Sequence, residues 1–135
     1  MILALLLQAA VPSLGALPQQ SLPGKGCAAY LWSVTDRRFV AMASADPAFL
    51  RILLDGTTVD LARASASGAG DYGFAGTTGY AAGGVTVTLD MTVARRGDLS
   101  AGAAVPSGTL TIARAGQDSL VVPVAGLIGC SSAGP

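Results

Sequence analysis

Few side chains in this chain of 135 residues could carry out acid–base or nucleophilic chemistry. The sequence has no His, no Glu, no Asn and a single Lys. A general base would have to be an Asp, and every Asp lies beside an expected turn or on the solvent face of an expected strand. The hydroxyls of Ser65 and Ser67 have no imidazole or lysine nearby in sequence to take their protons. We therefore expect a protein that is not an enzyme.

The sequence also contains few residues that could bind a metal ion or a cofactor. Only Asp could ligate a metal, and no Asp-x-Asp run occurs. Residues 68–73 spell G-x-G-x-x-G, but a dinucleotide site needs a helix after the last glycine, and no helical periodicity follows. Residues 96–98 spell Arg-Gly-Asp, which ordinary turn chemistry explains. We expect no metal and no cofactor.

Composition favours one packed domain. Hydrophobic residues make up 51% of the chain and charged residues 12%, with a formal net charge of zero. Such a balance excludes a disordered charged tail and a cationic nucleic-acid binder. The length fits a single domain of the usual size.

The amino-terminal segment is typical of export. Residues 2–11 are apolar but shorter than the roughly 20 residues that a membrane-spanning helix needs. With Pro12 and the small residues that follow, they indicate a signal peptide over residues 1–16, or alternatively a short core strand. Residues 17–26 are expected to form a flexible leader, residues 27–130 the domain and residues 131–135 a polar tail. The protein is then periplasmic or secreted, without a stable membrane anchor.

Cys27 and Cys130 bracket the expected domain. In an exported protein, two cysteines placed in this way indicate one disulfide. Since bonded cysteines need Cα atoms within about 7 Å, the first and last elements must be neighbours.

A β-hairpin is the best-defined local element. Residues 49–54 and 57–63 flank Asp55-Gly56, a two-residue turn of the primed type. Counting outward from the turn places Ile52 opposite Val59 on one face and Arg51 opposite Asp60 on the other. A slip by one residue would put both charges in the core, so the register is well specified.

Further strands complete an all-β fold. Residues 85–93 alternate perfectly between apolar and polar side chains, as in a half-buried antiparallel strand. Other strands are expected over residues 28–34, 39–43, 72–80, 108–114 and 119–125. Eight antiparallel strands with tied ends predict a small barrel or a closed sandwich, filled by side chains or holding one small ligand. Tyr30 and Trp32 share a face of the first strand and are expected to belong to the core and its rim, the alternative being a stacking platform.

One segment resembles a known family. The run from Leu54 to Gly68, with Tyr72 after it, resembles the periplasmic and membrane-bound inhibitors of c-type lysozyme, in which an Asp-Gly hairpin leads into a Ser-Ala-Ser-Gly loop and a Tyr. The family's second motif, with its lysine, is not present, because Tyr80 is followed by Ala-Ala-Gly-Gly.

The resemblance implies a small eight-stranded barrel and a loop that enters the lysozyme cleft. It also implies roles for four residues. Ser67 would hydrogen-bond the carboxylates of the enzyme, with Ser65 beside it in the same loop; Gly68 would permit the tight turn, and Tyr72 would support it. Without the lysine, weak inhibition is expected.

The functional expectation is an exported, non-enzymatic binding module that presents residues 64–70 to a secreted protein such as lysozyme. Two alternatives stay open. One is a structural accessory domain of the cell envelope without a discrete site, and the other is a carrier of a small apolar ligand, which requires an unfilled barrel.

Overall fold

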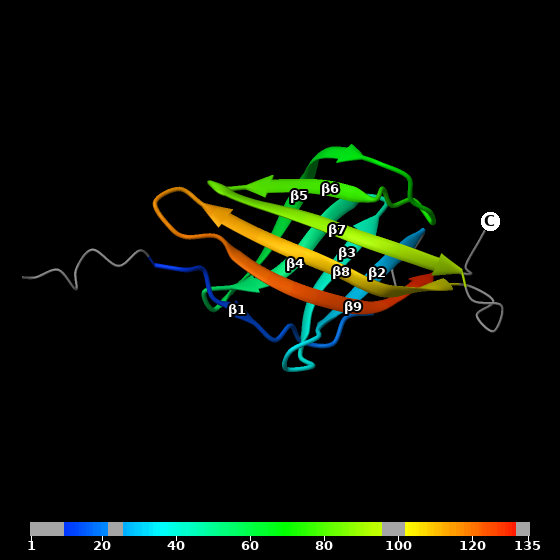
Figure 1. The fold of residues 1–135 in the computed structure, drawn as a ribbon, viewed down its shortest axis with the longest axis horizontal. Helices are drawn as coiled ribbons and strands as arrows, with labels where there is room; N and C mark the ends of the chain where they lie inside the picture. Colours follow the sequence, from blue (N-terminus) through cyan, green and yellow to red (C-terminus); the bar gives the residue numbers. More distant parts are fainter. Residues whose placement is uncertain (1–9, 22–25, 96–101, 132–135) are drawn as a thin grey trace, which may run out of the picture.

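The computed structural model describes residues 10–21, 26–95 and 102–131 (Figure 1). Within these ranges every regular element is a β-strand. The strands are β1 (Leu14–Gly15), β2 (Cys27–Ser33), β3 (Phe39–Ala45), β4 (Ala48–Leu54), β5 (Thr57–Ser67), β6 (Thr77–Ala82), β7 (Val85–Arg95), β8 (Gly102–Arg114) and β9 (Leu120–Cys130). A search of the same residues finds no helix long and apolar enough to cross a membrane.

The strands form a closed antiparallel barrel. From β2 to β9 each strand pairs with the next one in sequence, and β9 pairs back with β2. The ninth strand, β1, lies beside the last two residues of β4. The expected all-β barrel is confirmed, with one strand more than the sequence indicated.

The ring is closed at the point where Cys27 and Cys130 meet. They are directly paired across β2 and β9, with Cα atoms 4.0 Å apart and a disulfide between them. We call this end of the barrel the disulfide end; the β4–β5 and β8–β9 turns lie at the opposite end (Figure 1). The expected bridge, and the neighbouring first and last strands that it required, are confirmed.

The β4–β5 hairpin has the expected register. Asp55 and Gly56 form the turn with φ angles of 50° and 83°, as a primed turn requires. Ile52 pairs with Val59, and Arg51 pairs with Asp60 on the outer face. The guanidinium of Arg51 donates to both carboxylate oxygens of Asp60, at 2.7 and 3.0 Å.

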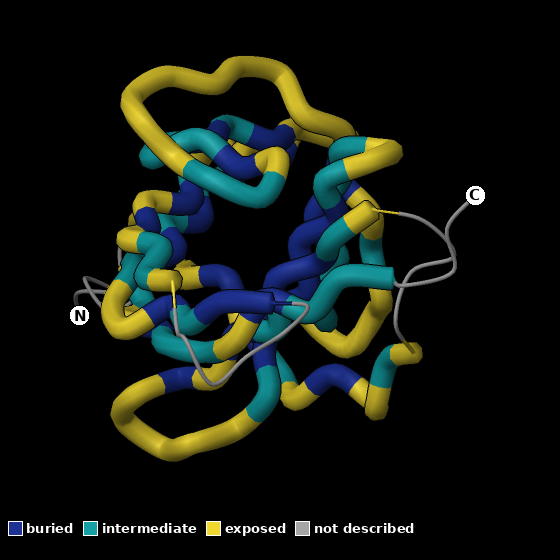
Figure 2. The backbone as a smooth tube through the Cα atoms, turned by 90° about the vertical axis from the view of Figure 1, so that its right-hand side faces the viewer, coloured by how far each residue is buried: buried dark blue, intermediate teal, exposed yellow. Residues whose placement is uncertain are grey.

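Inward-facing side chains occupy the barrel interior; Figure 2 looks along the barrel and shows the buried positions of the backbone around the ring of strands. In β7, Val87 and Leu89 are almost fully buried, whereas Thr86, Thr88 and Asp90 between and beside them are more exposed. The largest fully buried side chains are Tyr80, Leu31, Leu50, Ile52, Leu61, Leu89, Leu110, Ile112, Val40, Val87, Val105 and Val124. One continuous apolar cluster therefore fills the ring of strands.

Several strand boundaries differ from the sequence expectation. The strands expected to end at residues 63 and 125 continue to Ser67 and Cys130. The strand expected from Tyr72 begins only at Thr77, because Tyr72 and Gly73 have φ angles of 58° and 88°, which regular strand does not adopt. The strand expected from residue 108 begins at Gly102 and continues through a bulge around Pro106, whose missing N–H cannot join the ladder.

The amino-terminal segment lies against the barrel over its described part, residues 10–21. Leu14 and Leu17 are buried, and β1 pairs with Leu53 and Leu54. The structure thus shows a short strand inside the range expected for the signal peptide, residues 1–16. Residues 1–9 and the expected turn at residues 96–98 lie outside the described residues, and cleavage after residue 16 stays a prediction.

Candidate functional site

The serines of the expected binding loop lie in a strand. Ser65 and Ser67 lie in the last three residues of β5. Ser65 pairs with Gly79 of β6, and Ser67 pairs with Thr77. The loop expected over residues 64–70 is therefore strand up to Ser67. Small residues such as Ser and Ala carry little preference between strand and loop, which is why the sequence did not separate the two.

The end of β5 extends beyond its neighbour β4. The β4–β5 ladder stops at the pair Phe49 and Ala62, whereas β5 continues to Ser67. Among the described residues, this last part of β5 pairs only with β6. Residues 62–70 are all exposed, and we call residues 63–68 the β5 rim.

Gly68 ends the strand with a φ of +82°, the conformation expected for the glycine of a tight turn. The following loop folds over the disulfide end of the barrel, where Phe74 is buried in the main core cluster. A side chain at Gly70 would place Cβ 1.9 Å from the carbonyl oxygen of Phe74. The glycines of the G-x-G-x-x-G run thus serve close packing in a turn, and β6, not a helix, follows them.

Tyr72 is held in the loop by a charged pair. Its backbone N–H donates to Asp71 Oδ1 at 2.8 Å, and Arg95 Nε lies 2.7 Å from Asp71 Oδ2. The Arg95 guanidinium also lies over the Tyr72 ring, 5.5 Å from its centre. Hydrogen bonds from Arg95, and then from Tyr72, lower the pKa of Asp71 below its ordinary value. Asp71 and Arg95 thus fix the position of Tyr72 in this loop, and its supporting role toward a partner stays a prediction.

A second surface, on the outside of β2, β3 and β4, was not found from the sequence. Leu17, Ala28 and Met42 are buried there in an apolar cluster separate from the barrel interior. The half-buried side chains packed against it are Tyr30, Phe39, Phe49 and Leu53.

The expectation that Tyr30 and Trp32 belong to the core of the barrel is wrong. Both face outward, since they alternate with the buried Leu31, and Trp32 remains 39% exposed. The alternation of side chains along a strand correctly places Tyr30 and Trp32 on the same face of β2. Because both faces of β2 are apolar, the sequence does not show which of them faces the barrel interior. Apolar residues on the outer face of three adjacent strands were the sequence signal that could have indicated this outer apolar cluster.

Residues 17–21, which we call the strap, cross this outer surface. The strap is attached by the Leu17 N–H to the Phe39 carbonyl at 2.8 Å, and by the Tyr30 hydroxyl to the Ser21 carbonyl at 2.9 Å. Arg51, already paired with Asp60, also donates to Gln20 Oε1 at 2.8 Å. Part of the segment expected to be a flexible leader is therefore docked on the barrel.

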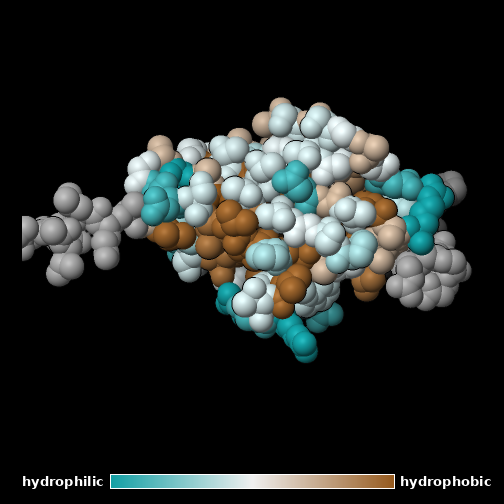
Figure 3. Space-filling view, viewed as in Figure 1, coloured by the Kyte–Doolittle hydropathy of each residue, from teal (hydrophilic) through white to brown (hydrophobic). Residues whose placement is uncertain are grey.

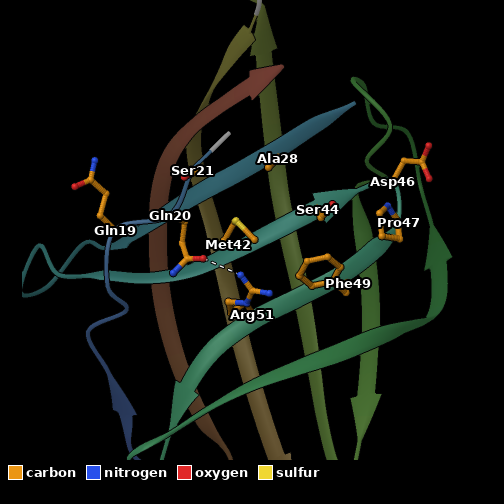
Figure 4. A pocket seen from close by; sticks show the side chains of 10 residues that line it. All are labelled: Gln19, Gln20, Ser21, Ala28, Met42, Ser44, Asp46, Pro47, Phe49 and Arg51. Atoms are coloured by element: carbon orange, nitrogen blue, oxygen red, sulfur yellow. Dashed lines mark hydrogen bonds between the residues drawn. The ribbon is translucent and has the colours of Figure 1, made fainter. Parts of the chain in front are cut away.

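The strap divides the outer surface into two grooves. The larger has a volume of about 720 Å³ and is lined by Gln19, Gln20, Ser21, Ala28, Met42, Ser44, Asp46, Pro47, Phe49 and Arg51. In Figure 4, Gln20 reaches across it to Arg51, while the Gln19 side chain points away. The smaller, of about 510 Å³, is lined by Leu17, Gln19, Gln20, Tyr30, Trp32 and Phe39. We call the smaller one the aromatic groove.

A third feature is a set of apolar side chains on the outside of β9. Val121 and Leu127 are 58% and 51% exposed, and Figure 3 shows apolar side chains gathered on this side of the barrel. Val121 also lines a groove of about 430 Å³ that contains polar residues, among them Ser33, Asp36 and Arg38.

The described residues contain no group of three acidic or cysteine side chains that could hold a metal ion. Several of their ionised side chains form pairs, among them Arg51 with Asp60 and Arg114 with Asp55. Comparison of the chain with protein-family models, curated proteins and solved structures finds no match.

Proposed function

We propose that this chain is an exported, non-enzymatic binding module whose β5 rim contacts a protein partner. The observation that supports this most is the extension of β5 past the end of β4, which leaves residues 63–67 paired on one side only within the described part of the chain. The strand lies at the end of a rigid barrel, where a partner can approach it.

Such an edge suits recognition of another chain. Backbone N–H and C=O groups along an unpaired strand edge can pair with an extended segment of a partner. The side chains of the rim after Arg63 are Ala, Ser and Gly, which leave the backbone open to close approach. The serine hydroxyls add hydrogen bonds without bulk.

A c-type lysozyme is the most specific partner that we propose, on the basis of the sequence resemblance. In this proposal the Ser67 hydroxyl donates to the enzyme's catalytic carboxylates, while Ser65 and Gly68 shape the rim and Tyr72 supports it. The barrel and its terminal disulfide are of the kind that the resemblance implies. Because no lysine accompanies Ser67, the charge of two carboxylates is only partly matched, and inhibition should be weak.

The test measures binding and inhibition together. Purified protein is titrated onto immobilised c-type lysozyme, and lysis of a cell-wall suspension is followed at micromolar protein. Ser67→Ala removes one hydrogen bond to a charged group, so affinity should fall about tenfold to a hundredfold. Ser119→Ala, at the opposite end of the barrel, is the matched control and should bind like the parent protein.

The absence of both binding and slowed lysis would exclude lysozyme as the partner. Equal affinity of the Ser67→Ala and parent proteins would exclude the role of Ser67 even if binding occurs. An unaltered melting temperature of both variants is required, because the argument concerns the surface and not the stability of the fold.

A further inference from the structure

We propose that the aromatic groove is a binding site for a neutral sugar ring of a glycan. It lies on the outside of β2 and β3 beside the strap, on a different surface from the β5 rim. The proposal therefore does not depend on the proposed protein partner.

Three aromatic rings form one wall of the groove. The centres of the Trp32 and Phe39 rings are 4.9 Å apart, and those of Tyr30 and Phe39 are 6.2 Å apart, with tilts of 39° and 35°. Phe39 lies between the other two and is half-buried, while Trp32 is the exposed member. The packing fixes the orientation of Trp32, so that its ring can receive a flat apolar ligand surface without reorganisation.

Residues with amide and hydroxyl groups also line the groove. Gln20 is fixed at both ends of its amide, because Nε2 donates to the Pro18 carbonyl at 2.9 Å and Oε1 accepts from Arg51. The Tyr30 hydroxyl donates to Ser21 and retains lone pairs that can accept. Gln19 lines the same groove with an exposed side chain. These groups can exchange hydrogen bonds with hydroxyls in several directions.

The lining chemistry selects the ligand class. None of the six side chains that line the aromatic groove is a carboxylate, guanidinium or ammonium group, so nothing there compensates a charged ligand. A wholly apolar ligand would cover the exposed Gln19 amide without offering it a hydrogen-bond partner, which is costly. A pyranose ring has an apolar C–H face for the aromatic wall and equatorial hydroxyls that can bond the Gln19 amide and the lone pairs of the Tyr30 hydroxyl. A volume of about 510 Å³ is in the range of small-molecule sites.

The only tryptophan of the chain lies in this groove, so intrinsic fluorescence reports directly on the site. We would titrate the full protein with tetra-N-acetylchitotetraose and, separately, cellotetraose, both neutral and rich in equatorial substituents, up to about 10 mM. A saturable change in Trp32 emission with at least one of them is expected. Gln19→Ala should weaken binding roughly two- to tenfold by removing one neutral hydrogen-bonding group.

Trp32→Ala, followed by titration calorimetry because its fluorescence is lost, should reduce affinity at least about tenfold. Val121→Ala, which removes an exposed apolar side chain from β9 outside the groove, is the matched control and should bind like the parent. Thermal melts establish that each variant is folded. No binding of either sugar, or undiminished binding by folded Trp32→Ala, would overturn the proposal, as would binding of decanoate but of neither sugar.

The two proposals fail independently. Ser67→Ala should leave sugar binding unchanged, and Trp32→Ala should leave direct binding to immobilised lysozyme unchanged. Sugar titrations are made without enzyme, because c-type lysozymes act on related glycans.

Discussion

Ser13 and Asp55 are joined by two reciprocal hydrogen bonds across 42 positions of sequence. The Ser13 N–H donates to the Asp55 carboxylate at 2.9 Å, and the Asp55 N–H donates to the Ser13 carbonyl at 2.8 Å. Arg114, at the end of β8, lies 2.6 Å from the second carboxylate oxygen. The turn residue that sets the β4–β5 register therefore also holds the amino-terminal segment against the barrel.

This arrangement predicts sensitivity to acid. The hydrogen bond from Ser13, followed by that from Arg114, lowers the pKa of Asp55 below its ordinary value of 3.8. A carboxyl group whose pKa is lower in the folded state stabilises the fold above 3.8, and this contribution is lost as pH falls through the lowered pKa. The melting temperature should therefore drop below about pH 4.

Asp55→Asn tests the assignment. The variant keeps an acceptor for Ser13 but has no charge for Arg114, so it should melt at a lower temperature than the parent at neutral pH. Its further loss on acidification should be smaller than that of the parent. Asp118→Asn, in an exposed turn at the same end of the barrel, is the control. Parallel pH curves for the parent and Asp55→Asn would contradict the prediction.

The sequence predicted best those elements in which nearby residues allow only one pairing register between two strands. The Asp55-Gly56 turn determines which residues of β4 and β5 face each other, and a slip would bury Arg51 and Asp60. The disulfide between Cys27 and Cys130 could be predicted without knowledge of the surrounding structure, because the chain contains only two cysteines.

Other features depended on contacts between distant residues. The end of β5 and the loop after it contain Ala, Ser and Gly, which suit strands and turns almost equally, and Tyr72 has a left-handed backbone that its side chain does not encode. Likewise, the strap lies on β2 to β4 through the contacts of Leu17 and Gln20 with residues of the barrel. Sequence alone therefore suggested the β5 rim residues but missed the aromatic groove.

Reduction of the Cys27–Cys130 disulfide should lower the stability considerably. The bridge spans 103 positions, for which chain entropy alone gives about 4.7 kcal/mol at a loop of roughly 100 residues. We expect a large fall in melting temperature with reducing agent, and the same fall in Cys27→Ser/Cys130→Ser without it. Alkylation of both thiols in protein that has not been reduced would contradict the bridge.

Removal of residues 10–16 should destabilise the barrel without abolishing it, because the ring from β2 to β9 closes without this segment. A chain that begins at Leu17 lacks β1, and with it the buried Leu14, whose burial contributes about 1.5–3 kcal/mol. It also lacks Ser13, so the pKa of Asp55 should move back toward its ordinary value and the acid sensitivity of the fold should decrease.

The comparison is a chain that begins at Ala10, with melting temperatures measured at neutral and acidic pH. Equal melting temperatures for the two chains would show that β1 adds nothing to stability. The amino-terminal mass of the protein isolated from its native source shows whether cleavage after residue 16 takes place, and such cleavage would yield the less stable form.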